Sequence, residues 1–118
     1  MADNKPKHGT FCWNELMTRD TGAAGKFYSK LLGWKPADSG MPGMNYTMFK
    51  VDGLEQSAGG MMAMPDEVPA NVPSHWMPYI TVDDIDATCA KVKELGGQVM
   101  YGTQAIPNLG RFFTIVDP

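Results

Sequence analysis

Apolar and polar positions along this chain form two runs of elements, each beginning with a strand and continuing into an amphipathic helix. In the first run, residues 9–18 are typical of a strand, and apolar side chains then recur at helical spacing until Gly33. Asp20 or Thr21 can cap this helix, and Gly33 can end it. The later segments of this run that favour strands are 34–38, 45–51 and 56–64.

A second run follows residues 65–74, which carry three prolines and no periodicity and are therefore typical of a linker. Its predicted elements are a strand over 75–82, a helix over 85–95, strands over 98–101 and 111–116, and a loop over 102–110. We therefore expect two βαβββ modules, 9–64 and an incomplete 75–118, joined by the linker into one structural domain.

An internal repeat supports this division. Shifting the chain by 63 positions superposes Trp13 on Trp76, Thr18 on Thr81, Asp20 on Asp83, Ala24 on Ala87, Leu32 on Leu95 and Gly33 on Gly96. These six identities fall within 21 aligned positions, at strand, cap, helix-face and helix-end sites. Each module alone has little core, so packing one sheet against the other would bury both.

Composition narrows the classes of function. The 118 residues are 43% hydrophobic and 19% charged, which is ordinary for a globular domain. The formal net charge of −3 gives no basic field for nucleic acid or an anionic membrane. The polar residues 1–7 do not resemble a signal peptide, and no apolar run reaches membrane-spanning length. We expect a cytoplasmic protein without nucleic-acid or membrane partners.

Several segments resemble the vicinal-oxygen-chelate superfamily, which includes glyoxalase I, bleomycin-resistance proteins and extradiol dioxygenases. They are WNELMTRD at 13–20, FYSKLLGW at 27–34, WMPYITVDD at 76–84, LGG at 95–97 and GRFFTIVDP at 110–118. The resemblance implies an α+β fold whose two tandem modules form an open barrel-like sheet around a cavity, with strand order 1-4-3-2 in each module. It also implies a last strand after residue 118, which this chain lacks. Because family members commonly pair, the resemblance further implies a homodimer.

In enzymes of this family a divalent metal in the cavity binds two vicinal oxygens of the substrate. The motif that supplies its ligands begins with histidine, and Trp13 and Trp76 occupy that place in the two modules. An indole N–H only donates hydrogen bonds, and residues 58–62 offer no hard oxygen ligand. With two histidines and two widely separated cysteines in the chain, we expect no metal cofactor.

Strand alternation places Trp13, Glu15 and Met17 on one face, which the resemblance assigns to the cavity. By the same rule Trp76, with Pro78 and Ile80, should line the opposite wall. The predicted ligand-binding residues are Trp13, Glu15, Met17, Met61, Trp76 and Arg111. Glu15 is also the candidate catalytic residue, because burial beside aromatic rings would suit a general base or an anchor for a cationic ligand.

Three functions remain open from sequence. The first is a small-molecule binding protein with an aromatic and Met-lined cavity and no metal. The second is a metal-dependent lyase, dioxygenase or isomerase with a rearranged site around Glu15 and His75. The third is an interaction subunit whose own side chains fill the cavity. Each singled-out residue also has a structural alternative, with the tryptophans as core aromatics and the methionines as adaptable core filler.

Overall fold

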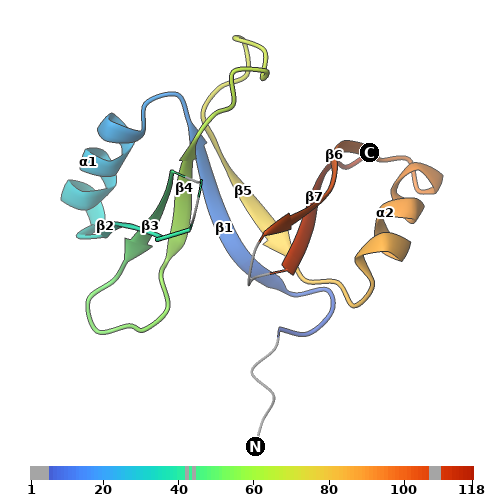
Figure 1. Ribbon diagram of the computed structural model, residues 1–118, viewed down its shortest axis with the longest axis horizontal. Coiled ribbons are helices and arrows are strands. Elements are labelled where there is room, and N and C mark those ends of the chain that lie inside the picture. Colours follow the sequence, from blue (N-terminus) through green and yellow to red (C-terminus); the bar gives the residue numbers. More distant parts are fainter. Residues whose placement is uncertain (1–5, 42, 44, 107–109) are drawn as a thin grey trace, which may run out of the picture. The chain divides into compact units, whose positions relative to one another are not determined.

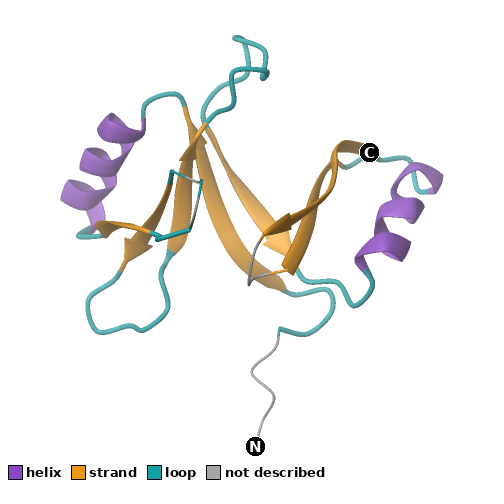
Figure 2. Ribbon diagram, viewed as in Figure 1, coloured by secondary structure: helices purple, strands orange, loops and turns teal. Residues whose placement is uncertain are grey.

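The computed structural model describes residues 6–41, 43, 45–106 and 110–118. Its elements are β1 (Phe11–Thr18), α1 (Thr21–Leu32), β2 (Lys35–Asp38), β3 (Tyr46–Lys50), β4 (Gly59–Ala63), β5 (His75–Ile80), α2 (Ile85–Glu94), β6 (Gln98–Ile106) and β7 (Gly110–Val116). They form a mixed α+β fold with a five-stranded and a two-stranded sheet (Figures 1 and 2). Contacts divide the chain into two compact units, Phe11–Tyr79 and Ile80–Pro118 together with the N-terminal segment up to Thr10.

The strands of the larger sheet lie in the order β2-β3-β4-β1-β5. β1 and β4 run parallel, with Glu15 opposite Gly60, whereas β2, β3 and β4 pair antiparallel. The order 1-4-3-2 expected for the first module is therefore confirmed. β5 extends the sheet beyond β1, at the edge away from β4.

Helix α1 packs against one face of this sheet. Asp20 caps it by accepting a hydrogen bond from the Ala23 amide, and Gly33 ends it in the left-handed conformation at φ 75°. The buried core under the helix consists of Leu16, Phe49 and Met61. Because β-strand side chains alternate, Glu15 lies on the sheet face opposite to Leu16 and α1.

Arg19 holds the connection between β4 and β5 against the end of β1. Its guanidinium donates hydrogen bonds to the carbonyl oxygens of Pro69 and Val72 at 2.8–3.2 Å. Its backbone amide donates to Ser74 Oγ, which in turn contacts Thr18 Oγ1. This proline-rich connection therefore has fixed attachments just before β5 begins.

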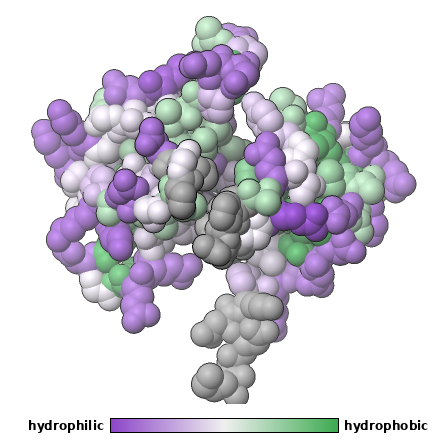
Figure 3. Space-filling view, in the orientation of Figure 1, coloured by the Kyte–Doolittle hydropathy of each residue, from purple (hydrophilic) through white to green (hydrophobic). Residues whose placement is uncertain are grey.

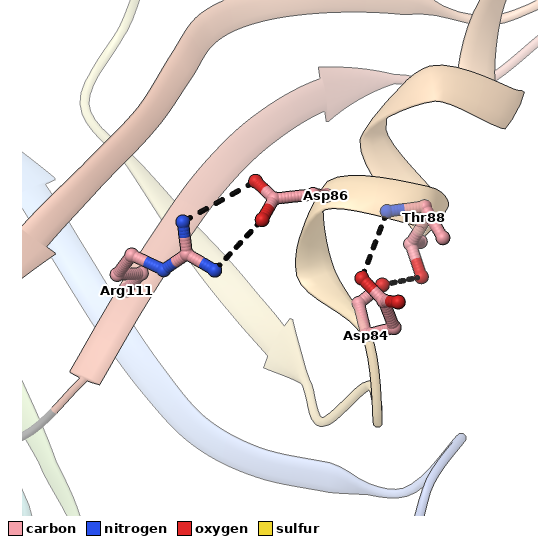
Figure 4. A network of polar contacts seen from close by, with 5 residues as sticks. Asp84, Asp86, Thr88 and Arg111 are labelled. Atoms are coloured by element: carbon pink, nitrogen blue, oxygen red, sulfur yellow. Dashed lines mark hydrogen bonds and ion pairs between the residues drawn. The ribbon is translucent and has the colours of Figure 1, made fainter.

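The other compact unit contains α2 and the β6–β7 hairpin. Asp84 caps α2 by accepting from the Ala87 amide and from Thr88, and Arg111 of β7 forms an ion pair with Asp86 at 3.0 Å (Figure 4). Exposed apolar residues of this unit include Leu95, Ile115 and Val116. Figure 3 shows a hydrophobic area over this unit and hydrophilic residues over the loop between β4 and β5.

The expected loop over 102–110 is wrong for most of its length. β6 continues to Ile106, and residues 104–106 pair with 110–112 of β7. Gly102 indicated a break, but the antiparallel pairing continues past it with register shifts on both sides of Tyr101. Residues 107–109 of the expected loop lie outside the described residues.

Neither α1 nor α2 nor any other helix in the described part of the chain combines the length and apolarity needed to cross a membrane.

Candidate functional site

The carboxylate of Glu15 is the most unusual group in the larger sheet. It belongs to the middle of β1, and its residue is only 8% exposed. The hydroxyl of Tyr79, from β5, donates a hydrogen bond to Glu15 Oε2 at 2.9 Å. None of the ion pairs found among the described residues includes Glu15. A carboxylate removed from water without a cation is costly and is typical of functional sites.

Two further aromatic residues complete the surroundings of Glu15. Trp13, two residues earlier on the same face of β1, donates its indole N–H to the Tyr46 hydroxyl at 2.8 Å. Tyr46, at the start of β3, lies close enough to Glu15 for the negative charge of the carboxylate to act on its hydroxyl. We call Trp13, Glu15, Tyr46 and Tyr79 the Glu15 network.

Gly60 makes room for this arrangement. A Cβ atom at Gly60 would overlap the ring and hydroxyl of Tyr46. Because Gly60 is the β4 partner of Glu15, the missing side chain lets the Tyr46 phenol cross β4 toward β1. The glycine therefore allows Tyr46 to reach Glu15 and Trp13.

Both tyrosines of the network are held as neutral phenols. Burial raises the pKa of each hydroxyl above its ordinary value near 10, and the negative charge of Glu15 raises it further. The hydrogen bond from Trp13 opposes the rise in the pKa of Tyr46 but does not reverse it. Tyr46 and Tyr79 therefore stay protonated across the physiological range, and Tyr79 stays a hydrogen-bond donor to Glu15.

The described residues do not fit the divalent metal found in enzymes of the resembling family. Trp13, at the expected ligand place, uses its only polar atom to donate to Tyr46. No group of three or more His, Cys, Asp or Glu able to hold a metal occurs in the described part of the chain. His75, part of the alternative metal site, hydrogen-bonds through Nδ1 to the Pro73 carbonyl at 2.8 Å.

The expectation that Trp76 faces Trp13 across a cavity is wrong. Trp76 lies on the α1 face of the sheet, where its indole N–H donates to the Tyr28 hydroxyl at 2.9 Å. Its ring packs against Trp34 and Phe49, with ring centroids 6.1 and 6.3 Å away. The internal repeat predicted the position of Trp76 along the strand, but it did not predict on which face of the sheet the indole lies. It is Tyr79, three positions on, that reaches Glu15.

The other predicted ligand-binding residues are dispersed. Met61 is 3% exposed and packs with Leu16 and Phe49 under α1, so it lies on the face opposite to Glu15. Met17 shares the Glu15 face by strand alternation and is half-buried. Arg111, in the other compact unit, is paired with Asp86 (Figure 4).

Met61 also borders a groove beside α1. It lines a shallow groove of about 390 Å³ between the helix and the sheet, together with Lys26, Pro36 and Thr47 among others. This groove is on the side of the sheet away from Glu15. Met61 is therefore mainly core filler, which was the structural alternative to a ligand-binding role.

Sequence reasoning missed Tyr46 and Tyr79. In the structure, His75, Met77 and Tyr79 of β5 are more buried than the residues between them. The sequence carries no signal of this alternation, since all six residues of β5 except His75 are apolar or aromatic. The position of Tyr46 carries no sequence signal either, because its reach depends on the absent side chain at Gly60.

The fold and the Glu15 network define a mixed α+β domain whose larger sheet carries a buried carboxylate among phenol and indole groups. The chain belongs to the Glyoxalase/Bleomycin resistance protein/Dioxygenase superfamily, whose family model matches residues 10–118. The resemblance suggested by the sequence motifs is thereby confirmed at the level of the superfamily.

Relatives agree with this assignment. The chain is 40% identical over 114 residues to the "Putative glyoxylase CFP32" of Mycobacterium tuberculosis, covering 95% of this chain and 43% of that protein. It is 34% identical over 110 residues to the "Anthracycline biosynthesis protein DnrV" of Streptomyces peucetius, covering 93% and 38%. A "Glyoxylase-like domain-containing protein" of Didymella fabae is 32% identical over 94 residues, covering 77% and 71%. The chain thus spans less than half the length of the two bacterial relatives.

Proposed function

We propose that this chain is a glyoxalase-like domain that binds a small organic molecule on the Glu15 side of its larger sheet, without the metal of the family's enzymes. The observation that carries the proposal is the buried Glu15 carboxylate, which accepts a hydrogen bond from the Tyr79 phenol but has no cation partner among the described residues. Stability alone does not favour such a group, because a buried charge is costly unless something compensates it.

The proposal includes the finer architecture suggested by the family. Two βαβββ modules, 9–64 and 75–118, would curl around a cavity lined by aromatic residues and methionines. Trp13 and Met17 would line it beside Glu15, whereas Trp76 and Met61 are not assigned to it. Trp13 at the usual ligand place would mark a branch of the family that binds without metal.

The ligand we favour is a planar aromatic compound. Indole and phenol rings offer flat apolar faces with polar edges, which suits stacking combined with a few directed hydrogen bonds. One relative is named for anthracycline biosynthesis, and anthracyclines contain a planar anthraquinone system. A cytoplasmic location and a homodimer remain predictions.

Thermal denaturation with 1,4-dihydroxyanthraquinone in EDTA tests this function. We expect a saturating concentration to raise Tm by about 4 °C or more, because ligand binding to the folded state alone stabilises it. Trp13→Leu should abolish most of the rise, whereas Leu54→Ala, in the exposed β3–β4 loop, should not. A rise that appears only after divalent metal is added would instead support a metal-dependent enzyme, and no rise with or without metal would contradict binding.

A further inference from the structure

The groups of the Glu15 network offer a ligand more acceptors than donors. The Trp13 indole N–H is donated to Tyr46, and the Tyr79 hydroxyl hydrogen is donated to Glu15. The Tyr46 oxygen accepts from Trp13, and its hydroxyl lies close enough to Glu15 for the charge of the carboxylate to act on it. Two of the three donors are therefore used within the network.

The Glu15 carboxylate still has capacity to accept. Two oxygens offer about four acceptor positions, and the Tyr79 phenol fills one of them. A group that binds Glu15 directly must therefore bring its own N–H or O–H. An anionic group placed against Glu15 would be repelled by the carboxylate.

The charge around Glu15 favours a cation among such groups. In the described structure Lys35 pairs with Asp52, Arg111 pairs with Asp86, and Arg19 binds the β4–β5 connection. These positive side chains therefore interact with groups other than Glu15. Trp13 and Tyr46 add aromatic faces beside the carboxylate, which attract cations through their π electrons.

We propose that the Glu15 network selects ligands that present a cationic nitrogen bearing hydrogens, and discriminates against anions on the same ring system. This inference rests on the proposed function and names the charge class of its ligand. The cationic N–H would donate to the free positions of the Glu15 carboxylate while the planar body of the ligand contacts the aromatic rings.

Two acridines of opposite charge provide the test. At pH 7.5, 9-aminoacridine is a cation and acridine-9-carboxylate is an anion on the same planar ring. Isothermal titration calorimetry with the full chain should show the amine binding about tenfold more tightly or better, as expected for a hydrogen bond to a charged group. Glu15→Gln should remove most of this preference, because the amide keeps the shape but not the charge.

Matched variants separate this effect from a folding defect. Glu55→Gln removes a carboxylate from the exposed β3–β4 loop and should retain the full preference. Tyr79→Phe removes one donor to Glu15, so the preference for the cation should persist or increase. Circular dichroism should show each variant folded before the titrations are compared.

The outcomes distinguish this inference from the proposed function. If both acridines bind equally, if the acid binds more tightly, or if Glu15→Gln keeps the preference, the cation inference is wrong while small-molecule binding stands. If neither acridine binds and the anthraquinone also gives no thermal shift, the proposed function fails and the inference fails with it.

Discussion

At the scale of single residues, the network depends on the mutual adjustment of one acid and two phenols. A hydrogen bond to a charged group contributes about 1.5–3 kcal/mol, so the Tyr79 phenol offsets part of the cost of burying Glu15. Glu15 in turn keeps the hydroxyls of Tyr46 and Tyr79 protonated by opposing a second negative charge nearby. The charge state of each phenol in the network therefore depends on Glu15.

The titration of these tyrosines gives a prediction with a definite sign. Tyr46 and Tyr79 should remain protonated in the folded protein well above pH 10, whereas the same residues ionise near pH 10 when the chain is unfolded. The unfolded state then binds fewer protons than the folded state, so the free energy of unfolding should fall as pH rises above about 10. Denaturant unfolding at pH 9 to 11 measures this loss.

Tyr79→Phe serves as the control for this prediction. It removes one of the two hydroxyls whose pKa is raised in the folded state, so the loss of stability above pH 10 should become smaller in this variant. In the folded wild-type protein the Tyr79 hydroxyl should not ionise near pH 10. The tyrosinate absorbance of wild type and Tyr79→Phe should therefore rise in the same way around that pH. An ionisation near pH 10 that disappears in Tyr79→Phe would contradict the burial of the Tyr79 hydroxyl.

At the scale of elements, the two adjacent glycines of β4 avoid two different obstacles. A Cβ at Gly59 would lie 2.7 Å from the Asn14 carbonyl oxygen, which is too close, whereas the Trp76 ring at 3.5 Å would be at ordinary contact distance. A Cβ at Gly60 would overlap Tyr46 on the other face. The glycine pair, which in sequence indicated only a loosened strand, therefore lets β4 approach the β1 backbone at Gly59 and lets Tyr46 cross the strand at Gly60.

Gly60→Ala tests this role of β4. The added methyl group cannot fit beside Tyr46, so the free energy of unfolding should fall by about 1–3 kcal/mol. Gly102→Ala in β6, where a Cβ would meet nothing within 4 Å, is the matched control and should cost little. In a Tyr46→Leu background the penalty of Gly60→Ala should shrink; an equal penalty in both backgrounds would show that Tyr46 is not the obstacle.

The same elements show what the sequence could and could not predict. Periodicity and end signals placed α1 between its Asp20 cap and Gly33, because capping and helical spacing are local properties. The side of the sheet taken by Trp76 depended on rings brought together by α1, β2 and β3, which no local pattern encodes. The length of β6 was set by its partner β7 rather than by its own composition.

At the scale of the whole molecule, family membership establishes the fold but does not establish which reaction or ligand the site serves. The superfamily model covers the chain from residue 10 onward, yet the residue at the usual metal-ligand place is Trp13, whose indole donates to Tyr46. One superfamily can host binding, resistance and catalysis, so the function must be argued from the site. Here the site consists of a carboxylate, two phenols and an indole.

Native mass spectrometry of the protein, purified without chelator, tests the central claim most directly because it reports metal and organic ligand together. Our account predicts a mass per chain equal to the polypeptide alone or to the polypeptide plus an organic molecule, without stoichiometric divalent metal. A mass that includes about one divalent metal ion per chain, and that loses it on treatment with EDTA, would contradict metal-free binding.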